Sequence, residues 1–270
     1  MRRHAFDRAR WVDLNPRARP ADYRRARRVA ESVAPEYARR GARAVVFAGS
    51  WVRGDAHRAS DIDLWVLGSR RSTEMLWRPP FMVSVNRTTE ATERRRLRDP
   101  ARMGGSVPGW RVATPLYDPH GTAAGLKSEA RRFRWQDVTT RCDRWVARSL
   151  VEWAEEAVKL VRAMAEGELQ TAAVQRNLLA DGLGLTTAIH RRLFWDSENG
   201  FWERLGEAMG GRWQHAQRRA LGEGTDLVRS VEAALDLYRE TALEAWECLD
   251  RDEQSIVAHA CRVMGHPIAR

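Results

Sequence analysis

The sequence predicts an α+β protein, in which a small mixed β-sheet with flanking helices is followed by a C-terminal helical bundle. Short apolar runs of β type occur before Pro119, and long stretches with apolar residues at helical spacing follow it. The 270 residues, 43% of them hydrophobic, are enough for one large domain or two ordinary ones. We place the boundary at this change of pattern, which gives domains of residues 1–125 and 126–270.

The first predicted element is an amphipathic helix from Ala21 to Arg40. Its apolar residues Tyr23, Ala26 and Tyr37 recur at helical spacing, and Gly41 is a plausible C-cap.

The predicted strands come next. The run 44–48 is short and apolar, and it ends at Gly49-Ser50; residues 61–67 form a second strand after a polar stretch. Two further strands are predicted at 81–86 and 111–117, with an exposed helix over 89–98 between them. The bundle is predicted as long helices at 134–166, 170–194 and 225–250, with shorter helices between Glu198 and Leu221.

Composition limits the classes of function. The formal net charge is +10, but only two of the 46 basic residues are lysines, so 46 minus 2 leaves 44 arginines, and these are scattered along the helices. Such scatter argues against a polynucleotide-binding face. The positive charge still suits small acidic partners, including a triphosphate. No apolar run is long enough to cross a bilayer, and three distant cysteines form neither a disulfide framework nor a zinc motif. We expect a cytoplasmic protein, neither secreted nor inserted in a membrane.

One motif carries chemistry: Gly49-Ser50, then Asp61-x-Asp63 at the start of a strand. Because alternate residues of a strand share a face, the two carboxylates point the same way, and together they can bind one cation. Mg²⁺ prefers such oxygen ligands together with substrate phosphates. Gly49 allows backbone to approach a phosphate closely, Ser50 adds a hydroxyl, and Arg53 adds a positive charge.

Each half of the motif is weak alone, since Asp-x-Asp pairs are common at strand ends and a Gly-Ser pair is only a turn. Other candidates are weaker still. Asp55 and His57 are better explained as polar residues of a loop than as metal ligands. Gly104-Gly105 lacks the strand-to-helix context of a dinucleotide-binding loop.

The combination resembles the nucleotidyltransferase superfamily that includes DNA polymerase beta, and more closely its kanamycin nucleotidyltransferase branch of antibiotic-modifying enzymes. The likeness covers about residues 40 to 200. Its matches are sparse outside the head, the name we use for the predicted catalytic domain of residues 1–125. Besides Gly49-Ser50 and Arg53, the matching stretches are Ser60-Asp61-Ile62-Asp63, Val83-Ser84-Val85-Asn86 with a Val-Glu-Val-Asn strand, Pro115-Leu116-Tyr117-Asp118 with Pro-Ile-Tyr-Asp, and Leu150-Val151-Glu152 with the first bundle helix.

The resemblance implies roles for the first bundle helix. There the family has a glutamate that acts as general base on the acceptor hydroxyl and a lysine that touches the triphosphate, which would be Glu156 and Lys159 here, the lysine one position out of register. Glu152 shares a helix face with Glu156 and is expected to bind substrate. The alternative is a routine surface ion pair between Glu155 and Lys159.

One position departs from the family. The superfamily usually places a third metal-binding carboxylate on a neighbouring strand, and Ser84 occupies that position here. A site with only Asp61 and Asp63 neutralises less metal charge, unless an acid such as Glu74, Glu90 or Asp118 is recruited.

These observations favour a Mg²⁺-dependent enzyme that transfers a nucleoside monophosphate, expected to be AMP from ATP, to a hydroxyl of a small molecule. Asp61, Asp63 and Glu156 are the expected catalytic residues, and Gly49, Ser50, Arg53 and Lys159 bind the nucleotide. The resemblance implies an aminoglycoside-like acceptor and a homodimer. Two alternatives stay open: a degenerate head that serves as a nucleotide-binding or regulatory module, and transfer to an RNA end, which requires salt-dependent RNA binding.

Overall fold

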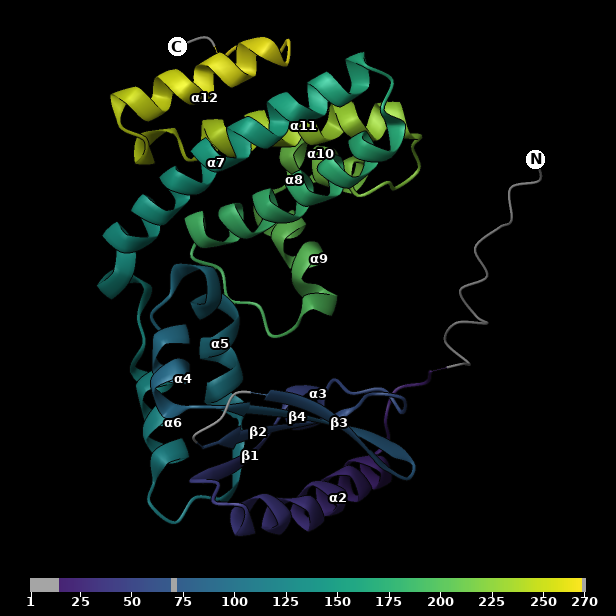
Figure 1. Cartoon of the computed structure of the whole chain (residues 1–270), viewed down its shortest axis with the longest axis vertical. Coiled ribbons are helices and arrows are strands. Elements are labelled where there is room, and N and C mark those ends of the chain that lie inside the picture. The colour runs from purple at the N-terminus through teal and green to yellow at the C-terminus, as the bar shows by residue number, and fades with distance from the viewer. Residues whose placement is uncertain (1–14, 69–71, 269–270) are drawn as a thin grey trace, which may run out of the picture. The chain divides into compact units, whose positions relative to one another are not determined.

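The computed structural model describes residues 15–68 and 72–268. The chain forms two compact units. Within the described residues, the first unit comprises the chain up to Asp99 together with Gly105–Phe133, and the second comprises Pro100–Gly104 and the chain from Arg134 onward. The predicted α+β class is confirmed, because the N-terminal region contains a mixed sheet and the C-terminal region is helical (Figure 1).

The sheet of the first unit has five strands in the order β3-β4-β2-β1-β5. The central pair, β2 and β4, is parallel, and the other neighbouring strands are antiparallel. The strands are β1 (Ala44–Ala48), β2 (Ile62–Leu67), β3 (Ser72–Arg78), β4 (Phe81–Thr88) and β5 (Thr114–Tyr117).

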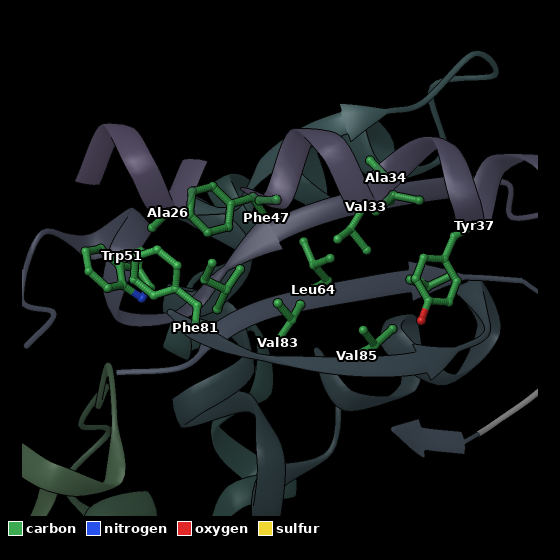
Figure 2. Close-up of a cluster of buried hydrophobic side chains, with 14 of the residues drawn as sticks. Ala26, Val33, Ala34, Tyr37, Phe47, Trp51, Leu64, Phe81, Val83 and Val85 are labelled. Atoms are coloured by element: carbon green, nitrogen blue, oxygen red, sulfur yellow. The ribbon is translucent and has the colours of Figure 1, made fainter. Parts of the chain in front are cut away.

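Helix α2 (Pro20–Arg39) packs along one face of this sheet and forms the core of the unit with it (Figures 1 and 2). Val33 of the helix and Leu64 and Val83 of the central strands are fully buried in this layer. The alternation of buried and less buried residues along β2 follows from the two-residue period of a strand. The opposite face of β2 therefore carries Asp63 together with Trp65.

The second face of the sheet is partly covered by aromatic residues. Trp65 of β2 packs against Trp110, the ring centroids lying 5.0 Å apart. The Trp110 indole donates to buried Glu93 at 3.1 Å, and Thr88 donates to the same carboxylate at 2.8 Å. This network joins the sheet to the helices of the unit. The short helices after β1 and along the second face are α3 (Gly49–Arg53), α4 (Glu90–Arg96), α5 (Pro100–Val112) and α6 (Thr122–Arg132).

The second unit consists of helices (Figure 1). Its two longest helices, α7 and α8, pack closely because Gly182 has no side chain: a Cβ there would lie 1.8 Å from the Trp153 ring. Tyr238 is fully buried and donates its hydroxyl to the carbonyl of Leu150 at 3.0 Å. The helices are α7 (Thr139–Ala165), α8 (Leu169–His190), α9 (Glu198–Met209), α10 (Gly211–Ala220), α11 (Leu227–Glu244) and α12 (Arg251–Val263), with short 3-10 turns at Trp135–Val138 and Trp246–Cys248.

Several element predictions need correction. Strand β3 and helix α5 were not predicted, and the strand expected over 111–117 begins only at Thr114, because residues 111–112 end α5. The helix expected over 225–250 ends at Glu244, and α12 follows as a separate helix with an Asp250–Glu253 capping box.

In the described parts of the chain, no helix combines the length and the apolar character needed to span a bilayer. All three cysteines are free thiols.

Candidate functional site

The centre of the site is the contact between the Gly49 turn and Asp63. Strand β1 ends at Ala48, which pairs directly with Asp63 of β2. The chain then turns through Gly49 with φ +74°, a conformation that L side chains rarely adopt. A Cβ on Gly49 would lie 1.9 Å from Oδ2 of Asp63. The Asp63 carboxylate therefore lies directly against the backbone of the turn, and only glycine fits there.

The two aspartates flank a residue that is fully buried. Ile62 and Leu64 have no exposed surface and face α2, so Asp63 points to the other face of the sheet. Burial and the nearby charge of Asp61 raise the pKa of Asp63 to about 6, and Arg53 lowers it in part. The site thus concentrates negative charge that is incompletely neutralised by the protein.

This arrangement fits a divalent cation. The carboxylates of Asp61 and Asp63 are close enough to interact, and burial and this repulsion disfavour the ionised form of Asp63. A bound cation would favour the ionised form, and carboxylate oxygens are ligands that Mg²⁺ prefers. Across residues 15–68 and 72–268, no group of three or more His, Cys, Asp or Glu side chains is placed to hold a metal. Any cation bound by Asp61 and Asp63 would therefore take its remaining ligands from groups other than the described His, Cys, Asp and Glu side chains.

Ser84 occupies the place beside Asp63 on the neighbouring parallel strand. The register of β2 and β4 pairs these two residues directly, and Ser84 is 8% exposed. The acids considered as replacements for a third carboxylate have other partners. Glu74 accepts a hydrogen bond from Tyr37 at 2.5 Å, Glu90 pairs with Arg94 at 3.0 Å, and Asp118 caps α6 through backbone amides.

The residues that follow Gly49 form α3 and are held by a buried tryptophan. Trp51 is 4% exposed, and its indole donates to the carbonyl of Ser60 at 3.3 Å, so the turn and the segment before Asp61 are tied together. Arg53 pairs with Asp55 at 3.3 Å and remains near enough to Asp63 to influence its pKa. Ser50 follows Gly49 directly, so its hydroxyl belongs to the first turn of α3.

Glu152, Glu156 and Lys159 lie on α7, in the second unit. Lys159 Nζ lies 2.9 Å from carboxylate oxygens of both Glu155 and Glu156, and hydrogen bonds to these two residues raise the pKa of Lys159. Glu156 is less exposed than Glu155, with 23% against 72% of its side chain accessible. Glu152 is exposed.

The structure accordingly brings together two sets of predicted residues, each within its own unit. In the first unit, Gly49, Ser50, Arg53, Asp61 and Asp63 lie where β1 ends and β2 begins. On α7, Glu156 and Lys159 form an ion pair that Glu155 shares.

Sequence reasoning missed the strand beside the site. Strand β3 adds Met75 and Trp77 to the sheet face that carries Asp63. The apolar run Met75-Leu76-Trp77, followed by the Pro79-Pro80 turn and the predicted strand at 81–86, is the signal that could have revealed it, because two such runs on either side of a short turn indicate a hairpin.

A family model described as the nucleotidyltransferase domain matches residues 27–101, a segment that includes β1 to β4 and both aspartates. A search of curated proteins gives no match. Among solved structures, a nucleotidyltransferase-like protein from Exiguobacterium sibiricum superposes with a TM-score of 0.53 at 13% sequence identity, covering 86% of this chain and 78% of that one. At this identity the likeness shows a shared fold. The finer resemblance to the kanamycin branch stays a prediction.

Proposed function

We propose that this protein transfers a nucleoside monophosphate from a nucleoside triphosphate, with ATP as the expected donor, to a hydroxyl group of a small molecule. The observation that carries this proposal is the contact of the Asp63 carboxylate with the Gly49 turn, where a Cβ would meet Oδ2 at 1.9 Å. A phosphate chain on the turn and a cation on the aspartates would then be immediate neighbours. The match of residues 27–101 to the nucleotidyltransferase domain supports the same activity.

Each residue of the head has a distinct role in the proposal. The turn at Gly49 lets a phosphate approach the backbone, and the hydroxyl of Ser50 donates to a phosphate oxygen. Arg53 contributes positive charge beside the aspartates. Asp61 and Asp63 would hold Mg²⁺, which when bound neutralises phosphate charge and favours departure of pyrophosphate.

The reaction is a displacement at the α-phosphorus. The acceptor hydroxyl oxygen forms a bond to the α-phosphorus. The bond between the α-phosphorus and the oxygen that bridges it to the β-phosphate breaks, which releases pyrophosphate. We assign Glu156 as the base that takes the hydroxyl proton, and Lys159 as a contact of the triphosphate. The hydrogen bond that Glu156 accepts from Lys159 would orient the Glu156 carboxylate. Glu156 is also less exposed than Glu155, which supports Glu156 rather than Glu155 as the base. Glu152, one turn earlier, would contact the acceptor.

The family resemblance makes aminoglycoside-like antibiotics the first acceptors to assay, and it suggests a homodimer. The free cysteines support a reducing, cytoplasmic setting.

One observation favours a second candidate function. Because Ser84 stands beside Asp63 without a charge, the head has two carboxylates where the superfamily usually has three. A degenerate head that binds nucleotide and acts as a regulatory module would have this composition.

Calorimetry with Mg²⁺ and ATP, followed by a pyrophosphate-release assay over aminoglycosides and lincosamides, separates the two functions. We expect binding, and release that depends on an acceptor. Asp61→Asn and Asp63→Asn should abolish both signals, whereas Asp22→Asn, which removes an acid from the α2 terminus, should retain them. Binding without release on every acceptor would support the regulatory module, and absence of binding would refute both candidates.

A further inference from the structure

The sheet face that carries Asp63 continues across β4 to the edge strand β3. Asp63 pairs with Ser84, and Ser84 pairs with Met75, so the three side chains lie side by side in one row. Residues paired across neighbouring strands share a face of the sheet, which means that Met75 faces the same side as the Asp63 carboxylate.

A second row begins at the other aspartate. Asp61 and Met82 directly precede the paired residues Ile62 and Val83, and continuing this register by one residue sets Asp61 beside Met82. Met82 in turn pairs with Trp77. From each aspartate, the neighbouring side chains on this face therefore lead outward to an apolar residue of β3.

These apolar side chains are exposed in a chain of which 30% is charged. The exposed fractions are 57% for Met75, 61% for Trp77 and 47% for Met82. A contiguous group of exposed large apolar side chains marks an interaction site more often than scattered single ones do. We call Met75, Trp77 and Met82 the apolar platform.

The charged residues of β3 lie on the opposite face. Glu74 accepts from Tyr37, and Arg78 donates to Glu36, both partners belonging to α2. On the face of the platform, the adjoining row pairs Thr73 with Asn86, which are also uncharged. A polycation extending over this surface would meet no compensating charge on this face of the described residues of β3 or β4, so its desolvation would be costly. An uncharged apolar group would instead gain stability by removing apolar surface from water.

The geometry of displacement decides which part of a reacting complex lies over the platform. In the proposed function, the pyrophosphate that leaves is held at Gly49, which follows β1 on one side of Asp63. The attacking oxygen must approach in line and hence from the side opposite to the leaving group. On that side of Asp63 lie β4 and then β3. The acceptor, rather than the pyrophosphate, would extend over these strands.

We propose, on the basis of the transferase function above, that the apolar platform binds the acceptor, and that the acceptor carries an uncharged apolar or planar ring close to its reacting hydroxyl. Trp77 offers the ring face for stacking, and the two methionines adapt their flexible side chains to the ring edge. This narrows the acceptor class away from polycationic aminosugars.

The test compares acceptors and variants in the full-length protein. Pyrophosphate release is measured with kanamycin as the polycation, and with pairs of uncharged glycosides that share their hydroxyls but differ in one ring, such as phenyl and methyl β-glucoside. We expect ring-bearing acceptors to be preferred. Trp77→Ala should raise the KM for the accepted compound on the order of tenfold, equivalent to about 1.4 kcal/mol, and leave the KM for ATP unchanged.

Two controls accompany this variant. Trp77→Phe keeps an aromatic face and should restore most of the affinity for the acceptor. Ile256→Ser removes an apolar side chain of similar exposure, 46%, from α12 and should change neither KM. Light scattering should give the same mass for the wild type and Trp77→Ala.

The outcomes distinguish this inference from the function on which it rests. If Mg²⁺ and ATP bind but only polycations, or no ring-bearing compounds, are accepted, the inference about the acceptor is wrong. Pyrophosphate release with the other acceptors then decides the transferase proposal. A change in the KM for ATP alone would assign the platform to the nucleotide base, and loss of a dimer in Trp77→Ala would assign it to a subunit contact. Failure of ATP binding removes both proposals.

Discussion

The backbone of Gly49 and the carboxylate of Asp63 are so close that no side chain fits between them, since a Cβ on Gly49 would lie 1.9 Å from Asp63 Oδ2. The contact joins the end of β1 to the start of β2 through the pairing of Ala48 with Asp63. Asp63 is thereby held at the turn expected to carry phosphates.

Gly49→Ala should therefore weaken Mg²⁺-dependent ATP binding by at least about tenfold, because the new methyl group displaces the carboxylate. Gly54→Ala is the matched control: Gly54 also has positive φ, +90°, but nothing lies within 4 Å of the position that a Cβ would take there. It should lose about 1 to 2 kcal/mol of stability through backbone strain alone and keep its ATP affinity. Calorimetry and urea unfolding measure the two effects. Equal loss of binding in both variants would show that strain, not contact with Asp63, is responsible.

The pKa of Asp63 predicts how stability depends on pH. With a pKa raised from 3.8 to about 6, the folded protein binds a proton that the unfolded chain releases between these values. The unfolding free energy should thus fall as pH rises from about 4 to about 6, by up to about 3 kcal/mol at about 1.4 kcal/mol per pKa unit. Asp63→Asn should lack this contribution, so the difference between wild type and variant isolates it in urea unfolding. Mg²⁺ should reduce the loss above about pH 6 because a cation favours the ionised carboxylate. A difference that is independent of pH would contradict the shifted pKa.

Ser84→Glu should increase metal affinity and the rate of pyrophosphate release, because it adds a carboxylate directly beside Asp63 in the register of β2 and β4. A gain on the order of tenfold is expected if the missing ligand limits the reaction. Ser32→Glu, an identical change at an exposed position of α2, is the control and should have no effect. An unchanged rate in a folded Ser84→Glu protein would mean that this position does not contact the metal.

Glu155 and Glu156 offer a matched pair, because both accept from Lys159 at 2.9 Å. If Glu156 is the base, Glu156→Gln should lower kcat by about 10² to 10⁴ with little change in ATP affinity. Glu155→Gln removes an equivalent ion-pair partner and should leave kcat nearly unchanged. Comparable losses in the two variants would assign the pair to surface stabilisation of α7.

Glu93 is predicted to stabilise the head without taking part in chemistry. It is 4% exposed and accepts hydrogen bonds from Thr88, Arg96 and Trp110. Glu93→Ala should cost about 3 kcal/mol, since it leaves buried donors without a partner. Glu90→Ala, on the same helix but more exposed, should cost under about 1 kcal/mol. Thermal unfolding would reveal the contrast, and similar losses would argue against the buried network.

The sequence predicted the part of the fold in which local pattern and burial agree. Strand β1 was predicted with its observed ends, and the strand predicted over 61–67 is β2, which begins one residue later at Ile62. The family resemblance implied that Ser84 lies on a strand next to the aspartates, and Ser84 pairs directly with Asp63. In these segments, apolar residues of the pattern such as Val45, Phe47, Ile62 and Leu64 belong to the core that includes α2.

Helix α5 could not be predicted in this way. Its sequence contains Pro108 and several glycines, which signal a loop when read locally. In the structure these glycines admit aromatic rings: a Cβ on Gly104 would lie 2.0 Å from Trp195, and one on Gly109 would lie 3.1 Å from Trp65. Both partners are far away in sequence, so the reason for the glycines is visible only after folding. The edge strand β3 was missed for a related reason: its apolar residues Met75 and Trp77 are exposed, whereas Leu76 between them packs against the core, so the strand has no continuous core pattern.

The division of α5 bears on how the protein can be dissected. Its first turn, Pro100–Gly104, belongs to the helical unit, and the rest of the helix belongs to the sheet unit. Expression of residues 134–270 alone would deprive Trp195 of the Gly104 carbonyl that its backbone amide contacts at 3.1 Å. A fragment ending at residue 133 would keep that carbonyl but lose its donor. Because no single cut yields both halves intact, domain-swap chimaeras with related chains would need to exchange this short segment together with the C-terminal region.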